Sequence, residues 1–133
     1  MKKFLFILLF VLPFTGFAQQ NSEKDSTNER IYTSVDVQPV FPGGDDEFYK
    51  YILKNIKYPK KERKKNIQGK VYLTFVISEV GKIMNAKVLR GVSKSIDEEA
   101  LRVLNSMPTW KPGTRDGRAV RVQLNVPINF SLK

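Results

Sequence analysis

The reactive side chains of this chain are above all carboxylates and amines, because the sequence contains neither histidine nor cysteine. That composition excludes disulfides and thiolate metal sites, and it removes the commonest acid/base group and metal ligand. The acidic triplet Asp97-Glu98-Glu99 is explained by its place at the start of a predicted helix, where carboxylates complement the helix dipole. We therefore expect no enzyme activity, no catalytic residues, no metal site and no cofactor.

The lysine and arginine side chains favour a different kind of site, one that binds anions. The run Lys-Lys-Glu-Arg-Lys-Lys occupies residues 60–65 of a chain with a formal net charge of +10. Such a run is either a solvated face or a patch that holds the domain near the anionic headgroups of a membrane. Nucleic acid is not expected as a partner, because the basic residues lack interleaved exposed aromatic side chains.

The amino-terminal residues have the pattern of a secretory signal peptide. Two lysines precede an apolar run over residues 4–12, and small residues form a cleavage pattern that ends at Ala18. Even when it is extended to Ala18, the run is shorter than the roughly 20 residues that span a bilayer. We expect a signal peptide over residues 1–18 that directs export of the chain, and a flexible polar lead over residues 19–34.

The folded domain is expected over residues 35–133. Acidic residues that follow Gly44 predict the start of a helix, since they complement its dipole. This helix should stop near Asn55, because Pro59 disfavours helical backbone at Tyr58.

A second helix is expected from a capping box formed by Ser95 and Glu98, which apolar residues follow at helical spacing. The segment Met-Pro-Thr-Trp-Lys-Pro-Gly over residues 107–113 ends this helix, since its prolines and glycine force a turning path. Trp110 is expected to pack in the core, because a tryptophan brings a large apolar area to bury.

Alternating apolar residues predict three strands. Two of them, over residues 69–77 and 83–89, form a hairpin whose turn contains Gly81. The third runs over residues 120–132 and is the longest alternating pattern in the chain. Pro127 lies inside it and removes one backbone donor, so we expect this strand to be at an edge of the sheet near that residue.

Several short motifs occur in an order typical of one family. They are Gln38-Pro39-Val40-Phe41-Pro42-Gly43-Gly44, Tyr58-Pro59, Gly69-Lys70-Val71, Phe75, Gly81, Asp97-Glu98-Glu99-Ala100, Trp110-Lys111-Pro112-Gly113 and Val126-Pro127-Ile128-Asn129-Phe130. On these residues, from about Val35 to Leu132, the sequence resembles the TonB C-terminal domain family. Its first part is similar to the short TonB-like proteins common in Bacteroidetes.

The resemblance implies a small α+β domain with a three-stranded antiparallel sheet and helices packed on one face. It also implies a periplasmic protein-binding module that engages TonB-dependent outer-membrane receptors in energy-coupled transport. In the family, a receptor peptide pairs with the edge of the last strand, and the stretch just before the Tyr-Pro pair contributes to recognition. Carried onto this chain, the partner-binding residues are Asn55, Ile56, Lys57, Tyr58, Arg121, Val122, Gln123, Leu124 and Asn125.

The chain departs from a full energy transducer in two respects, which leave alternatives open. It lacks a convincing spanning helix and the long proline-rich segment with which the family crosses the periplasm. The alternative to a free module is an energy transducer that an uncleaved amino-terminal segment anchors in the inner membrane, facing the periplasm and working with inner-membrane motor proteins. The sequence also leaves open whether the domain dimerises through exchanged strands.

Overall fold

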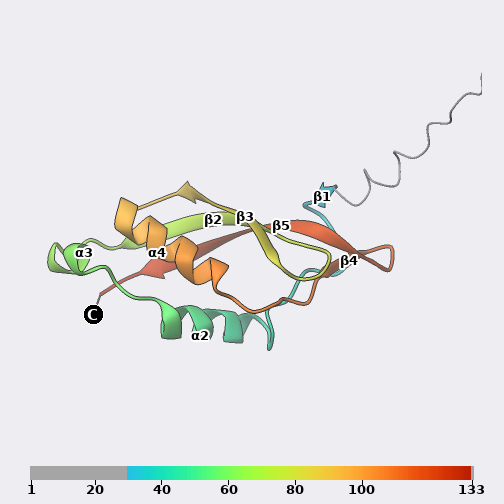
Figure 1. Ribbon diagram of the computed structural model, residues 1–133, viewed down its shortest axis with the longest axis horizontal. Coiled ribbons are helices and arrows are strands. Elements are labelled where there is room, and N and C mark those ends of the chain that lie inside the picture. Colours follow the sequence, from blue (N-terminus) through green and yellow to red (C-terminus); the bar gives the residue numbers. More distant parts are fainter. Residues whose placement is uncertain (1–29, 133) are drawn as a thin grey trace, which may run out of the picture.

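The computed structural model describes residues 30–132, which form a twisted sheet with helices on one of its faces (Figure 1). The α+β class and the one-sided packing are therefore confirmed. The expected signal peptide and most of the expected lead lie outside the described residues. No helix in the described part of the chain is long and apolar enough to cross a membrane. In chain order the elements are β1 (Ile31–Tyr32), α2 (Asp45–Asn55), α3 (Lys60–Lys64), β2 (Gly69–Ile77), β3 (Ile83–Arg90), α4 (Lys94–Asn105), β4 (Gly113–Arg115) and β5 (Arg118–Phe130).

The sheet has five strands, so the expectation of three was wrong. Its order is β1-β5-β2-β3, with β4 paired to β5. The three expected strands form its antiparallel centre, since β3 and β5 both pair antiparallel with β2. β1 and β4 are two and three residues long, too short to show the period-two pattern from which strands are predicted. β1 lies in the last part of the segment expected to be a flexible lead, and it pairs parallel with β5.

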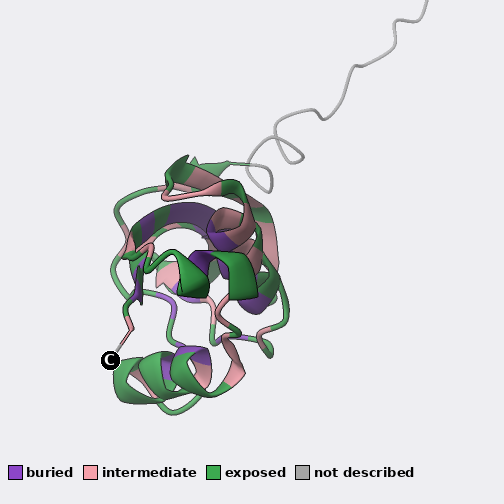
Figure 2. Ribbon diagram, turned by 90° about the vertical axis from the view of Figure 1, so that its left-hand side faces the viewer, coloured by how far each residue is buried: buried purple, intermediate pink, exposed green. Residues whose placement is uncertain are grey.

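Helix α2 ends at Asn55 as expected and packs through one stripe of its surface. Acidic residues occupy its first turn and Lys54 its last turn, which complements the helix dipole at both ends. Phe48 and Ile52 are buried against the domain, and the opposite face of the helix is exposed (Figure 2). Burial of each of these side chains contributes about 1.5–3 kcal/mol, which holds a helix that has no side-chain cap at its start.

Helix α4 begins earlier than predicted. Its N-cap is Ser93, whose Oγ accepts the N–H of Ile96 at 3.3 Å. Ser95 lies inside the helix, so the capping box of Ser95 and Glu98 was wrong. The Ser93 hydroxyl also donates to the buried carboxylate of Glu62 in α3 at 2.8 Å. The start of α4 is thus fixed by a tertiary contact, which the spacing of residues in the sequence does not show.

Trp110 packs in the core as expected, with 6% of its surface exposed. Its ring contacts the rings of Phe41, Phe48 and Phe75 edge to face, at centroid distances of 5.6, 5.6 and 5.8 Å. Its backbone N–H donates to the carbonyl of Gly81 at 2.8 Å. Gly81 has a φ of 86°, and a Cβ there would lie 1.9 Å from the Trp110 carbonyl oxygen. The segment after α4 and the turn before β3 are therefore in direct backbone contact, and that turn requires glycine.

Candidate peptide-binding site

Most of the expected site residues lie on β5. This strand pairs with β2 from Val122 to Phe130 without a shift in register. Its even-numbered residues in this stretch are buried or half-buried, whereas Gln123, Asn125 and Asn129 are exposed. The strand therefore has one core face and one solvent face, as the alternation of its sequence predicts.

Pro127 shows in which direction β5 presents its backbone groups. Alternate residues of an antiparallel strand point both backbone groups at the partner, and the residues between them point both away. Because Pro127 has no N–H and pairs with Tyr72 in regular register, it belongs to the set that points away from β2. Gln123, Asn125 and Asn129 have the same parity, so their N–H and C=O groups point away from β2 as well.

The outer edge of β5 is covered only at its beginning. β1 pairs there with Arg121 and Val122. In the part of the chain that the structure describes, no strand pairs with this outer edge after Val122. The free edge therefore runs over residues 123–130 and includes Pro127, which agrees with the edge predicted from the sequence. Two of the expected contact residues, Arg121 and Val122, are already paired within the domain.

The side chains of the expected strand residues are mostly engaged within the domain. Arg121 Nε donates at 3.2 Å to a carboxylate of the turn after β2, and Gln123 Nε2 donates at 2.9 Å to a hydroxyl on β2. Val122 is buried, and Leu124 packs against the hydrophobic core. Of the five, Asn125 has the side chain that is exposed and makes no contact of this kind among the described residues. What this part of β5 can offer a partner is mainly its backbone.

The residues that follow α2 are held in place by α4. The N–H of Lys57 donates to Glu99 Oε2 at 2.6 Å. Arg102 donates to the same oxygen at 2.7 Å and to the carbonyl of Asn55 at 2.9 Å. Burial by itself would raise the pKa of Glu99, but the hydrogen bonds from Arg102 and from the Lys57 N–H outweigh it and lower the pKa. The ionised carboxylate of Glu99 thus connects the end of α2 to α4.

Ile56 and Tyr58 pack inward. Ile56 lies against the hydrophobic core, and the Tyr58 ring lies 5.7 Å from the ring of Phe130. The Tyr58 hydroxyl donates to the carbonyl of Ile67, and burial raises its pKa. Within this stretch, Lys57 has the exposed side chain. The stretch is therefore a rigid support with one accessible cation, rather than a row of free side chains.

The structure does not bring the two groups of expected residues together. Tyr58 contacts Phe130, which is the last residue of β5. A strand rises about 3.3 Å per residue, so Asn125 lies about 17 Å along β5 from that end. A peptide paired only with residues 121–125 would not reach the stretch after α2, whereas a peptide that continues to the end of β5 would.

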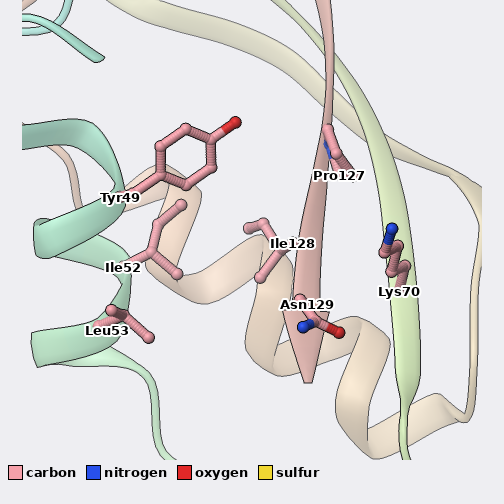
Figure 3. A pocket seen from close by; sticks show the side chains of 7 residues that line it. All are labelled: Tyr49, Ile52, Leu53, Lys70, Pro127, Ile128 and Asn129. Carbon is pink, nitrogen blue, oxygen red and sulfur yellow. The ribbon is translucent and has the colours of Figure 1, made fainter. Parts of the chain in front are cut away.

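Between the two groups lies an apolar groove that was not predicted from the sequence. Its volume is about 220 Å³, and it opens between α2 and β5 (Figure 3). Tyr49 and Leu53 are 49% and 75% exposed, although they lie on the same helix as the buried Phe48 and Ile52. The signal available in the sequence was that Tyr49 and Leu53 are apolar and that each directly follows a residue of the buried stripe. The groove is lined by Tyr49, Ile52, Leu53, Lys70, Pro127, Ile128 and Asn129.

The basic run forms α3 and carries its charge on the surface. Glu62 is buried, and the cations around it are exposed: Lys60, Lys61, Arg63, Lys64 and Lys65. Arg63 lies over the Tyr58 ring at 5.4 Å. Both interpretations of the run, a solvated face and an anion-binding patch, agree with this arrangement.

Comparison with known proteins shows the family. Residues 54–132 match the family described as Gram-negative bacterial TonB protein C-terminal. This chain belongs to the TonB C-terminal family. The matched residues run from the end of α2 to the end of β5 and so include the sheet's antiparallel centre and α4. The comparison with curated proteins gives no match.

Solved TonB C-terminal domains share the fold. The solution structure of the Helicobacter pylori TonB C-terminal domain is 25% identical to this chain, with a TM-score of 0.51, and the alignment covers 66% of this chain and 92% of that one. The solution structure of the Pseudomonas aeruginosa TonB C-terminal domain is 21% identical, with a TM-score of 0.52 and coverage of 78% and 94%. The resemblance to TonB is thus confirmed, and the narrower resemblance to the Bacteroidetes type stays a prediction.

Membership of the family indicates the general role. TonB proteins take part in energy-coupled transport across the outer membrane, and they interact with TonB-dependent receptors. They are periplasmic or anchored in the inner membrane, and the family is one of energy transducers rather than enzymes.

Proposed function

We propose that this chain is a periplasmic binding module that engages TonB-dependent outer-membrane receptors in energy-coupled transport. In this proposal, the amino-terminal peptide of a receptor binds as an added strand on the free edge of β5. The observation that carries it is the regular edge over residues 123–130, whose outward backbone groups have no strand partner in the described part of the chain. Such an edge is a template for another strand, and the affinity comes mainly from main-chain hydrogen bonds.

The proposed contacts follow the direction of the backbone. Gln123, Asn125 and Asn129 offer both N–H and C=O, and Pro127 offers its C=O alone. The stretch over residues 55–58 lies at the far end of β5, where its exposed cation, Lys57, contacts the flank of the peptide. Leu124 supports the edge through the core. Arg121 and Val122 join the site only when β1 no longer pairs with them.

A pair of substitutions at one position tests this function. Asn125→Pro removes an outward N–H, so it should abolish the binding of a labelled peptide from a receptor's amino terminus while circular dichroism shows folded protein. Asn125→Ala is the matched control, since it keeps the N–H, and it should change the affinity by less than about threefold. Undiminished affinity in the folded proline variant would move the site away from this edge.

The same binding site would serve a chain that stays anchored in the inner membrane. Because TonB proteins are periplasmic or anchored in the inner membrane, an uncleaved amino-terminal segment would make the same domain part of a transducer that works with inner-membrane motor proteins. Mass determination of the amino terminus in envelope fractions distinguishes the two: a start at Gln19 supports the free module, and an intact Met1 in the inner membrane supports the transducer.

We propose a second, weaker interaction, between the basic run over residues 60–65 and anionic headgroups. The exposed cations of this run would each contribute about 1 kcal/mol close to such a surface. Replacement of the four lysines Lys60, Lys61, Lys64 and Lys65 by glutamine should reduce co-sedimentation with anionic vesicles. Equal sedimentation of the variant and the wild type would leave α3 as a solvated face.

A further inference from the structure

The apolar groove lies directly beside the free edge of β5. Ile128 and Ile52 are buried, and Leu53 and Tyr49 of α2 form the exposed wall opposite the strand (Figure 3). Pro127 and Asn129, whose backbone groups point outward, belong to the same lining. A strand added to β5 would therefore cover this groove.

The size and lining of the groove indicate what it can hold. Small-molecule sites usually enclose about 300–1,000 Å³, and this groove has a volume of about 220 Å³. Its walls are mostly aliphatic and aromatic carbon. That volume suits one or two aliphatic side chains better than a cofactor or a metabolite.

The pleat of the sheet decides which residue of an added strand would enter. Side chains directly opposite each other on neighbouring strands point to the same face. Ile128 points to the helical face, since it belongs to the core together with Ile52. The peptide residue opposite Ile128 would thus point at α2, and the residues before and after it would point to the other face. One position of the peptide is singled out by this geometry.

The charge of one lining residue restricts the occupant of the groove further. Lys70 lines the groove. This lysine forms no salt bridge among the described residues. A basic residue beside the inserted side chain would be repelled, whereas a neutral or acidic one would be accommodated.

We propose that the groove between α2 and β5 is a specificity pocket that takes one aliphatic side chain of the bound receptor peptide, at the position opposite Ile128. This inference rests on the proposed function, because strand addition supplies the register that places the side chain. It adds a selective element to an edge that would otherwise bind through backbone groups alone, and it explains why Leu53 and Tyr49 are apolar although they are exposed.

The test is a double-mutant cycle between peptide and domain. Receptor amino-terminal peptides that bind the wild-type domain are resynthesised with each apolar residue replaced singly by alanine. One replacement should lower the affinity about tenfold, and replacements of its immediate neighbours should lower it by less than about threefold. In Leu53→Gln, that one replacement should cost less than about twofold, because the wall it contacts is gone. Leu89→Gln on β3 is the matched control, since Leu89 is 60% exposed and lies away from the groove.

The outcomes separate this inference from the function on which it rests. Peptides that bind but show no single sensitive position, or the same sensitivity in Leu53→Gln, would overturn the pocket and leave strand addition in place. Receptor peptides that do not bind at all would overturn both. Self-association that Leu53→Gln abolishes, with peptide affinity unchanged, would assign the groove to a second copy of the chain and also overturn the pocket.

Discussion

The central sheet has two long edges, formed by β3 and β5, and they differ in how open they are to pairing with another strand. β3 is the last strand in the sheet order, and its pairing with β2 has two register shifts. Each shift places an extra residue in β3, one at Leu89 and one near Asn85, whose φ is 52°. β5 keeps a single register along β2, and only two of its residues are covered by β1. Bulges protect an edge from unintended pairing, so the difference marks β5 as the edge that is kept available.

The greatest loss of stability is expected from a substitution on the side of the sheet where β3 forms the edge. Trp110 contacts Phe75 of β2 and bonds through its backbone to the turn that leads into β3. Trp110→Ala should lower the free energy of unfolding by about 3–5 kcal/mol, because it leaves a large cavity in the core. Urea denaturation followed by circular dichroism measures it. A loss below about 1 kcal/mol would mean that the ring does not support the β3 side.

A smaller effect is expected where α4 holds the segment beside the far end of β5. The folded-state pKa of Glu99 is lowered from its ordinary value of 4.5, so the ionised carboxylate stabilises the fold above that pH. This contribution is lost as the pH falls through the lowered pKa. Glu99→Gln should cost about 1 kcal/mol at neutral pH, since solvent screens the half-exposed Arg102, and the difference from wild type should vanish in acid.

The control for that substitution is its neighbour on the same helix. Glu98 is exposed and forms no salt bridge among the described residues, so Glu98→Gln should leave the unfolding free energy within about 0.5 kcal/mol at all pH values. Unfolding curves measured from neutral to acidic pH provide the comparison. A Glu99→Gln deficit that grows in acid would contradict the assigned role of the carboxylate.

The smallest change in stability is expected for β1, the short strand that covers the beginning of the outer edge of β5. β1 has two residues, and the half-buried Tyr32 lies under the guanidinium of Arg115 at 5.1 Å. Tyr32→Ala should cost less than about 1 kcal/mol of stability. It should strengthen the binding of peptides that reach Arg121 by about two- to threefold, and leave shorter peptides unaffected. Calorimetric titration of a long and a short peptide measures this, and no change with either would mean that β1 does not compete for the edge.

The sequence predicts the helices and strands whose apolar pattern continues over many residues. It misses the strands that are too short to show such a pattern. α4, β2 and β5 follow from residues that alternate or recur over nine or more positions. β1 and β4 are strands only because they pair with β5, and no pattern in their own residues predicts that pairing. The shifted start of α4 has the same cause, since Ser93 is selected by its contact with Glu62.

The candidate site was predictable only in part. Pro127 signals an outer edge through the chemistry of its missing N–H, which is a local property. The covering of Arg121 and Val122 by β1 is a long-range event, and so is the meeting of α2 with β5 that forms the groove. Tyr49 and Leu53 become informative only once the structure shows that their exposed faces lie beside a free strand edge.

Amide resonances of the isotope-labelled domain show which edge of the sheet binds a peptide, because the residues of β3 and β5 have separate resonances. When a receptor peptide is added, the N–H groups of Gln123, Asn125 and Asn129 should gain hydrogen-bond partners. Their hydrogen exchange should slow and their resonances should shift, while the amides of β3 stay unchanged. Slowed exchange along Ile83–Arg90 with no change on β5 would place the peptide on β3 and overturn strand addition to β5.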